Sequence, residues 1–271
     1  MPSREPLERE ANINVTRHEI QVGHQTVSYQ VVGEGEPIIL IHGLAGSSRW
    51  WERNIRALAE HYRLYLLDLP GFGIMRRFRQ RYALDEIASG IVSWMEAVGI
   101  NQAHFVGHSM GGYLCLWIAA HYPERIQCLV LVSPAGIPRV RSLPGYALPL
   151  LVALRSLKPR FFFLLLSDAL RAGPLTIVRS AQDLLTRDIR ECLKDITAPT
   201  LLIWGEYDSL VPPMVGAMLN QEIRQARLLI LKKAGHVSMF DQPTQFNAAV
   251  LTFLADQVRG TEERQKDSLC R

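Results

Sequence analysis

The chain has 271 residues, of which 48% are hydrophobic and 21% charged, enough for one large core. The net charge of +4 is too mild to indicate a nucleic-acid partner, and the first ten residues carry both signs of charge without the apolar segment of a signal peptide. The four cysteines have neither C-x-x-C nor metal spacing, so we expect no disulfide, no metal and a cytoplasmic location.

The predicted elements alternate between strands and helices. A polar lead-in precedes a β-hairpin, with strands at 15–22 and 26–32. Continuous apolar runs, typical of strands buried on both faces of a parallel sheet, lie at 37–41, 64–67, 103–106, 128–132, 201–204 and 228–231. Helical patterns lie at 51–61, 84–98, 113–121, 213–223 and 244–258, before a polar tail that we expect to be disordered. The alternation predicts an α/β protein with a mostly parallel, doubly wound sheet.

The most informative motif is G-x-S-x-G at residues 107–111, which lies between a predicted strand and a predicted helix. A sharp strand-to-helix turn would leave Ser109 exposed at its apex. The glycines on either side are needed because a Cβ atom there would collide with neighbouring backbone. The alternative is a glycine-rich turn with an ordinary serine.

Polar residues follow other strands of the same predicted sheet. Asp208 follows the strand at 201–204, and His236 follows the last strand. Loops at the carboxyl ends of parallel strands meet at one edge, and the chain order Ser, Asp, His suits a nucleophile, an orienting acid and a base. Taken singly, Asp208 could be a turn residue and His236 a surface-loop residue. Together with Ser109 they predict a catalytic triad, whereas Asp68 is expected to be a structural turn residue.

An acyl-transfer site also needs hydrogen-bond donors for the oxyanion of its tetrahedral intermediate. We predict the backbone N–H groups of Met110 and Leu44. His42, Gly43 and His108 are candidate substrate-binding residues. Two of them have simpler alternatives, because His42 could brace its loop and His108 could pack on the turn.

With these motifs the chain resembles the α/β-hydrolase superfamily, in the branch of small esterases, meta-cleavage-product hydrolases and cofactor-free haloperoxidases. The matching segments are 42–43, 68–73, 107–112, 205–212 and 235–236. The resemblance implies an eight-stranded, mostly parallel sheet with helices on both faces, a Ser109–Asp208–His236 triad and no cofactor. It also implies a short helical lid at 137–190, inserted into a core formed by 1–136 and 191–271.

The sequence departs from the family pattern at two places. Residues 74–77 replace a small segment that often contains serine, and His108 stands where carbon–carbon bond hydrolases commonly carry asparagine. The second departure weakens the carbon–carbon hydrolase interpretation.

The expected lid is apolar, with no charge between residues 143 and 154, but each apolar run is too short to span a bilayer. Its nine basic and three acidic residues give it a charge of +6 (9 − 3), and the arginines at 76–81 are expected to border the same entrance. Such a rim suits an acidic membrane face, an acidic carrier protein or a carboxylated substrate. A solvated surface without a partner remains an alternative.

The sequence therefore predicts a serine hydrolase that cleaves ester-type bonds of an apolar or lipid-like small molecule through an acyl-enzyme. The alternatives are a carbon–carbon bond hydrolase or perhydrolase on the same triad, and a ligand receptor of this fold with little turnover. The sequence leaves the oligomeric state and the physiological substrate open.

Overall fold

The computed structural model describes residues 14–77, 82–137 and 143–269, with side chains described as far as residue 257. Eight strands form one sheet: β1 (Thr16–Val22), β2 (Gln25–Val32), β3 (Pro37–Ile41), β4 (Arg63–Leu67), β5 (Ala103–His108), β6 (Ile126–Val132), β7 (Thr200–Gly205) and β8 (Ala226–Leu231). Their order is β1-β2-β4-β3-β5-β6-β7-β8. β2 is antiparallel to β1 and to β4, and all other neighbours are parallel, which confirms the predicted sheet.

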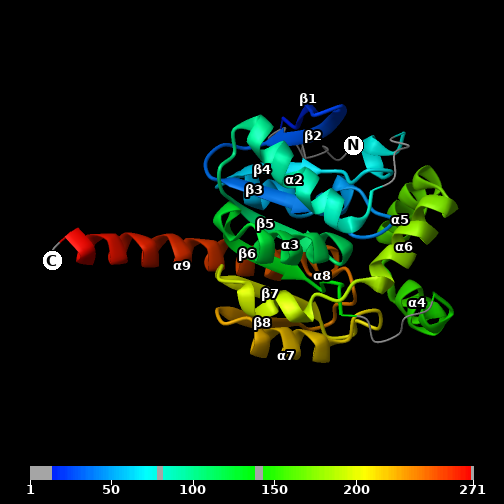
Figure 1. Cartoon of the computed structure of the whole chain (residues 1–271). Coiled ribbons are helices and arrows are strands. Elements are labelled where there is room, and N and C mark those ends of the chain that lie inside the picture. Colours follow the sequence, from blue (N-terminus) through cyan, green and yellow to red (C-terminus); the bar gives the residue numbers. More distant parts are fainter. Residues whose placement is uncertain (1–13, 78–81, 138–142, 270–271) are drawn as a thin grey trace, which may run out of the picture.

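Helices cover both faces of the sheet (Figure 1). One face carries α2 (Leu84–Val98), α3 (Met110–His121) and α7 (Pro213–Glu222). The other carries α1 (Ile55–Ala59), α8 (Ser238–Asp241) and α9 (Pro243–Leu269). Both faces of the central strands are therefore buried.

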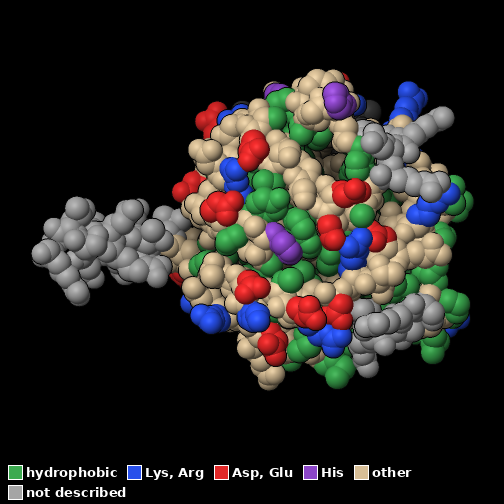
Figure 2. All heavy atoms as spheres, in the orientation of Figure 1, with side chains coloured by type: hydrophobic (Ala, Val, Ile, Leu, Met, Phe, Trp, Pro, Cys, Tyr) green, Lys and Arg blue, Asp and Glu red, His purple; other side chains and the backbone are tan. Residues whose placement is uncertain are grey.

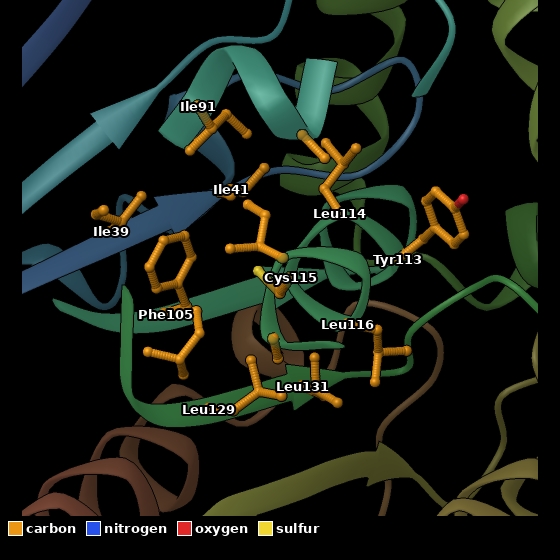
Figure 3. Packing of buried hydrophobic residues seen from close by; sticks show 14 of the residues in the cluster. Ile39, Ile41, Ile91, Phe105, Tyr113, Leu114, Cys115, Leu116, Leu129 and Leu131 are labelled. Carbon is orange, nitrogen blue, oxygen red and sulfur yellow. The ribbon is translucent and has the colours of Figure 1, made fainter. Parts of the chain in front are cut away.

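Strand β3 shows why the strand sequences are continuously apolar rather than alternating. Ile39 and Ile41 pack into the core on the α3 side, whereas Ile38 and Leu40 pack into the core on the α9 side. Figure 3 shows the first of these cores, where Ile39 and Ile41 lie close to the apolar side chains of α3. All four β3 residues are fully buried, as expected for a strand covered on both faces.

The predicted insertion contains three helices between β6 and β7. They are α4 (Ala147–Ser156), α5 (Pro159–Ala172) and α6 (Pro174–Thr186). α5 and α6 each begin with a proline at the first helical position, where the missing N–H costs nothing, and they meet at 97° around Gly173. Arg139 and Arg141 of the predicted lid, and Arg79 and Arg81 of the predicted rim, lie outside the described residues. The division of the chain into core and lid stays a prediction.

Two of the predicted elements are wrong in length. In place of the single helix expected at 51–61, the structure has two short ones. A 3-10 helix spans Ser48–Trp51, and the α-helix α1 that follows has only five residues. The tail expected to be disordered continues α9 as far as Leu269, away from the body of the protein (Figure 1). Its residues 262–266, Glu-Glu-Arg-Gln-Lys, all have good helix propensity, which favours this extension of the helix.

In the described part of the chain, no single helix combines the length and the apolar character needed to cross a membrane. α5 and α6 satisfy that test only as a bent pair.

Candidate active site

Ser109 lies at the apex of a sharp turn between β5 and α3. Its backbone has φ 50° and ψ −111°, which is neither helical nor extended. Such a conformation costs on the order of 1–3 kcal/mol and persists only where the surroundings fix it. Here the N–H of Ser109 donates to the carbonyl of Val132 at 2.9 Å, and the carbonyl of Ser109 accepts from Ala135 at 3.0 Å. The turn is therefore held from β6.

The glycines of the motif have no room for a side chain, as predicted. A Cβ atom on Gly107 would lie 2.5 Å from the carbonyl oxygen of Gly111, and one on Gly111 would lie 2.4 Å from the carbonyl oxygen of Ile41. The first turn of α3 thus packs directly on the backbone of β5 and β3. This contact brings Ser109 close to the loop that follows β3.

Substitution Gly111→Ala is expected to lower the free energy of unfolding by about 1–3 kcal/mol, because the carbonyl of Ile41 must move to admit the methyl group. Gly90→Ala is the control. Gly90 lies within α2 with open space around its Cα, so alanine there should stabilise the protein by about 0.5–1 kcal/mol. Urea denaturation measures both changes, and a Gly111→Ala protein as stable as the wild type would contradict this account.

Asp208 and His236 are brought together at the carboxyl ends of β7 and β8. Nδ1 of His236 lies 2.9 Å from Oδ2 of Asp208. The other carboxylate oxygen of Asp208 accepts the N–H groups of Leu210 at 3.0 Å and Val211 at 2.9 Å. Asp208 is buried and fully hydrogen-bonded as a carboxylate, so it orients the imidazole with Nδ1 as the donor. This geometry suits the predicted role of His236 as a base, which would act through its second ring nitrogen.

Ser109 and His236 share one cavity of about 770 Å³. Leu44 and His108 also line it, and the remaining lining is almost wholly apolar and comes largely from α4, α5 and α6. The sequence did not point to Trp50, which lines the cavity and packs against both His108 and Phe161. The two residues predicted as nucleophile and base thus border the same apolar chamber.

The predicted oxyanion donors are placed as follows. Met110 is the first residue of α3, and the first hydrogen bond of that helix runs from Tyr113 to Ser109, so the helix itself leaves the Met110 N–H free. Leu44 lines the cavity on the side of the β3 loop. Neither N–H donates to another group in the described part of the chain. Their role stays a prediction.

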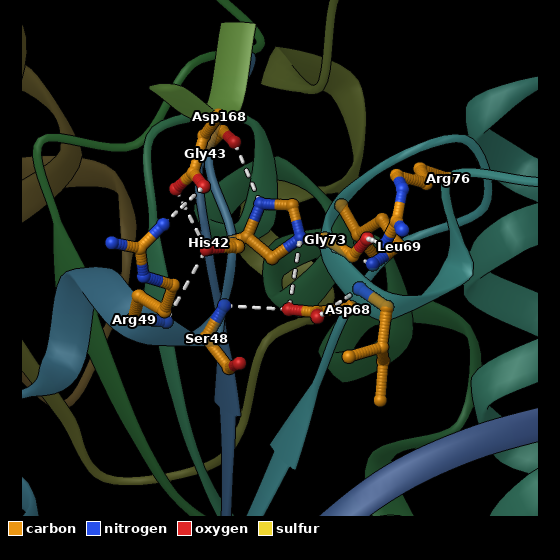
Figure 4. Close-up of polar contacts among 11 residues, drawn as sticks. His42, Gly43, Ser48, Arg49, Asp68, Leu69, Gly73, Arg76 and Asp168 are labelled. Carbon is orange, nitrogen blue, oxygen red and sulfur yellow. Dashed lines mark hydrogen bonds and ion pairs between the residues drawn. The ribbon is translucent and has the colours of Figure 1, made fainter. Parts of the chain in front are cut away.

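His42 does not reach the cavity, so its predicted role in substrate binding is not supported. The ring is completely buried, and its Nε2 accepts the N–H of Leu69 at 3.0 Å. The proton is therefore on Nδ1, which donates to the carbonyl of Gly43 at 2.8 Å (Figure 4). Burial lowers the pKa of His42, which keeps the ring neutral. These contacts match the alternative in which His42 braces its loop.

Gly43 is also absent from the cavity wall, and it packs against the turn at Ser109 instead. A Cβ atom on Gly43 would lie 2.6 Å from Nδ1 of His108 and 3.2 Å from Cβ of Ser109. Asp68 accepts the N–H groups of Ser48 and Ile74, which is the structural role expected for it (Figure 4).

His108 borders the cavity and contacts the predicted base. Its Nε2 lies 2.9 Å from the carbonyl oxygen of His236, and the two rings are 4.8 Å apart. A carbonyl oxygen only accepts, so Nε2 carries the proton. Burial is the main cause that lowers the pKa of His108 well below its usual value, and the neighbouring His236 lowers it further. His108 therefore stays neutral and fixes the backbone of His236.

Acid is expected to destabilise the protein through His108. Below about pH 6.5 the unfolded chain takes up a proton that the folded chain does not, because the native pKa is lowered. The free energy of unfolding then falls by up to about 1.4 kcal/mol per pH unit until the native pKa is reached. Urea denaturation across this window should show a shallower fall for His108→Asn. The control His24→Asn removes an exposed histidine and should keep the wild-type slope; equal slopes for all three proteins would contradict the prediction.

Asp168 entered the sequence analysis only as one of the three acidic residues in the charge of the lid, and the structure gives it a further role. It is almost completely buried on the inner side of α5, where it accepts Ser47 Oγ at 2.7 Å and Arg49 at 3.2 Å (Figure 4). The buried positions of α5 are Phe161, Leu164 and Asp168, spaced three and four residues apart. That spacing was the sequence signal that Asp168 faces the core.

The described residues contain no group of three or more histidine, cysteine or acidic side chains placed to hold a metal ion. Cys115 and Cys128 are buried packing residues, as expected from their apolar elements.

A serine at a strained strand-to-helix turn, with an Asp–His pair at the ends of the last two strands, can be compared with known proteins. A family profile described as "alpha/beta hydrolase fold" matches residues 36–187 and 171–243. The chain belongs to the α/β-hydrolase fold family. This confirms the resemblance inferred from the sequence and makes the protein a hydrolase.

The α/β hydrolase has relatives that are named for different activities. It is 31% identical to a 2-hydroxy-6-oxo-6-phenylhexa-2,4-dienoate hydrolase of Comamonas testosteroni, over 84% of this chain and 91% of the relative. It is 29% identical to a pimeloyl-[acyl-carrier protein] methyl ester esterase of Nitrosospira multiformis, over 86% and 99%. It is also 31% identical, over 83% of this chain, to a dihydrolipoyllysine-residue acetyltransferase component of the acetoin cleaving system of Pseudomonas putida, of which it spans only 65%.

Among solved structures, a membrane phospholipase A described as a bacterial virulence factor superposes on the α/β hydrolase with a TM-score of 0.79. The identity is 25%, and the match covers 90% of this chain and 86% of the other.

Proposed function

We propose that the protein hydrolyses esters with an apolar acyl group, using Ser109 as nucleophile. The observation that carries this proposal is the apolar cavity of about 770 Å³ that Ser109 shares with His236, whose imidazole is bonded to Asp208 at 2.9 Å. The volume suits a medium-sized to long acyl chain. The relatives named as a methyl ester esterase and as a phospholipase support an ester substrate.

The mechanism has two steps. His236 takes the proton of Ser109 as Oγ attacks the ester carbonyl, and the N–H groups of Leu44 and Met110 stabilise the oxyanion. The protonated His236 donates to the leaving alcohol, which departs and leaves an acyl-enzyme. His236 then removes a proton from water as the water oxygen attacks the acyl group, and the protonated His236 returns that proton to Oγ of Ser109, which departs as the free serine and releases the acid. Asp208 keeps His236 in the tautomer that both steps require.

A second candidate is a carbon–carbon bond hydrolase on the same triad, favoured by the 31% identity to a dienoate hydrolase. The wall of the cavity weakens it, because a substrate with a charged carboxylate and a dienol would meet few polar partners among the apolar side chains of α4, α5 and α6.

A panel of p-nitrophenyl esters of increasing chain length, run beside a vinylogous diketone, tests the proposal. Multiple turnovers on the esters, rising with chain length, are expected, and a fluorophosphonate should label Ser109. Turnover of the diketone alone would favour the carbon–carbon hydrolase. A single slow turnover on every substrate would instead favour a ligand receptor of this fold.

A further inference from the structure

The outward surface of the three inserted helices is unusually apolar. We call it the lid face. Of the fourteen large apolar side chains that are exposed in the described residues, ten belong to it. Its members are Leu148, Leu150, Leu151, Val152, Phe162, Phe163, Leu166, Leu170, Leu175 and Val178. Figure 2 shows apolar atoms along the edge of the molecule where α4, α5 and α6 lie. Single exposed apolar residues are ordinary, but a concentration of this size marks an interaction surface.

Packing within the chain does not account for this face. α5 already buries Phe161 and Leu164 against the core, and its opposite side carries Phe163, Leu166 and Leu170. A helix that covers a core is normally polar on its outer side. Leu170, 74% exposed, lies close to the corner where α5 meets α6, so the most exposed apolar side chain stands at a projecting angle of the surface.

The charges on the three helices divide in a consistent way. Their two carboxylates, Asp168 and Asp183, face the protein: Asp168 accepts from Ser47 and Arg49, and Asp183 accepts from Leu84 N and Arg187. Three exposed guanidinium groups, at Arg155, Arg171 and Arg179, have no hydrogen-bond or ion-pair partner in the described part of the chain.

Some of the basic residues counted in the charge of +6 are paired. Arg187 pairs with Asp183 and Arg190 with Asp188, two carboxylates that the +6 already includes, whereas Glu52 and Asp85 from outside the insertion pair with Arg160 and Arg187. The unpaired charge on the lid helices is nevertheless all positive.

The lid face also contains the mouth of the substrate cavity. Leu150, Phe162, Leu166 and Val178 line the cavity and are exposed on the lid face as well. A molecule that enters from this side therefore crosses apolar side chains from the surface to Ser109.

We propose that the lid face seats the enzyme on an anionic lipid bilayer, with its apolar side chains in the interface and Arg155, Arg171 and Arg179 on lipid phosphates. Apolar burial and positive charge act together in this mode of binding. A symmetric dimer through the same face is disfavoured, because it would bring the unpaired arginines of both copies into one interface that offers them no unpaired carboxylate on these helices. The proposal does not require catalysis by Ser109.

The test uses the full chain with Ser109→Ala, so that vesicles stay intact and binding is measured apart from hydrolysis. Co-sedimentation with phosphatidylcholine vesicles containing about a third phosphatidylglycerol should show binding that weakens as salt rises from about 0.1 to 1 M. Leu170→Glu with Leu175→Glu should lower the affinity at least about tenfold. The control Met214→Glu changes an exposed methionine of α7 and should bind normally.

Charge is tested with a matched pair of triple variants. Arg155→Gln, Arg171→Gln and Arg179→Gln together should lower binding to the anionic vesicles by roughly a hundredfold, at about fivefold per arginine. The control Arg63→Gln, Arg224→Gln and Arg227→Gln removes the same charge at the amino ends of β4 and β8, at the opposite edge of the sheet. It should bind like the wild type.

Three results would overturn the proposal: equal binding to neutral and anionic vesicles, equal loss in both triple variants, or no binding at all. Analytical ultracentrifugation distinguishes the other possible partners of the lid face, a second copy of the chain and an acidic carrier protein. A dimer abolished by Leu170→Glu with Leu175→Glu, without vesicle binding, would assign the face to a second copy. Binding to an acidic acyl-carrier protein but not to vesicles would assign it to that partner.

Discussion

Ser109→Ala is expected to lower the hydrolysis of soluble p-nitrophenyl esters by a factor of about 10⁴ to 10⁶ and to leave the fold intact. The loss is large because the methyl group cannot form the acyl-enzyme, so the Asp208–His236 pair has no nucleophile to activate. Stability should change little, because Oγ of Ser109 makes no hydrogen bond within the described residues and the strained backbone is held by Val132 and Ala135. Steady-state kinetics on the best ester of the panel measures the effect.

Ser133→Ala is the matched control. Ser133 is also buried, also has a positive φ of 44°, and follows the neighbouring strand β6, but it does not line the cavity. Its replacement should leave turnover within a few-fold of the wild type. Retention of near-full activity by Ser109→Ala would remove Ser109 from the mechanism, whatever the behaviour of the control.

Asp208→Asn is expected to lower kcat by about 10⁴ with little change in the fold. In the variant, the amide oxygen would keep the N–H groups of Leu210 and Val211, which leaves the NH₂ group facing His236. The imidazole must then accept at Nδ1 and carry its proton on the nitrogen that faces the cavity. In that tautomer it cannot take the proton of Ser109, so the nucleophile is not activated.

Glu206→Gln provides the comparison, because Glu206 lies in the same loop and accepts the backbone N–H of Lys233 without touching His236. Its kcat should stay near the wild-type value. At alkaline pH the kcat of Asp208→Asn should also rise more steeply than that of the wild type, because a deprotonated nucleophile no longer needs the base. A loss below tenfold in Asp208→Asn would show that another group orients His236.

The elements that place Ser109, Asp208 and His236 could be predicted because their signals are local. A strand buried on both faces is continuously apolar in sequence, as β3 is. The glycines at 107 and 111 indicate a close backbone contact, because no residue with a Cβ atom would fit there. Parallel strands then bring the residues after β5, β7 and β8 to one edge.

The remaining features depend on contacts between distant residues. The spacing of Phe161, Leu164 and Asp168 indicates that Asp168 faces the core, but its partners Ser47 and Arg49 lie more than a hundred residues earlier in the chain, and no local pattern identifies them. The bond from His108 to the carbonyl of His236 spans 128 residues, and no spacing in the sequence indicates it. The length of α9 was missed for the opposite reason, because a polar segment gives no burial pattern from which to recognise a helix.

The unequal anchoring of the three inserted helices also determines how a bulky ester could enter. α5 fixes Phe161, Leu164 and Asp168 beneath it, whereas α4 fully buries only Ala153, and α6 fully buries no side chain but packs Ile177 and Leu184 partly against the core. Lifting α5 would return two fully buried apolar side chains to water, at about 3–6 kcal/mol, whereas the apolar side chains of α6 are only partly buried and lifting it would cost less. We therefore expect α5 to stay in place while α4 and α6 move. The entrance to the cavity would then widen on either side of α5, and the β3 loop beneath α5 would keep its conformation.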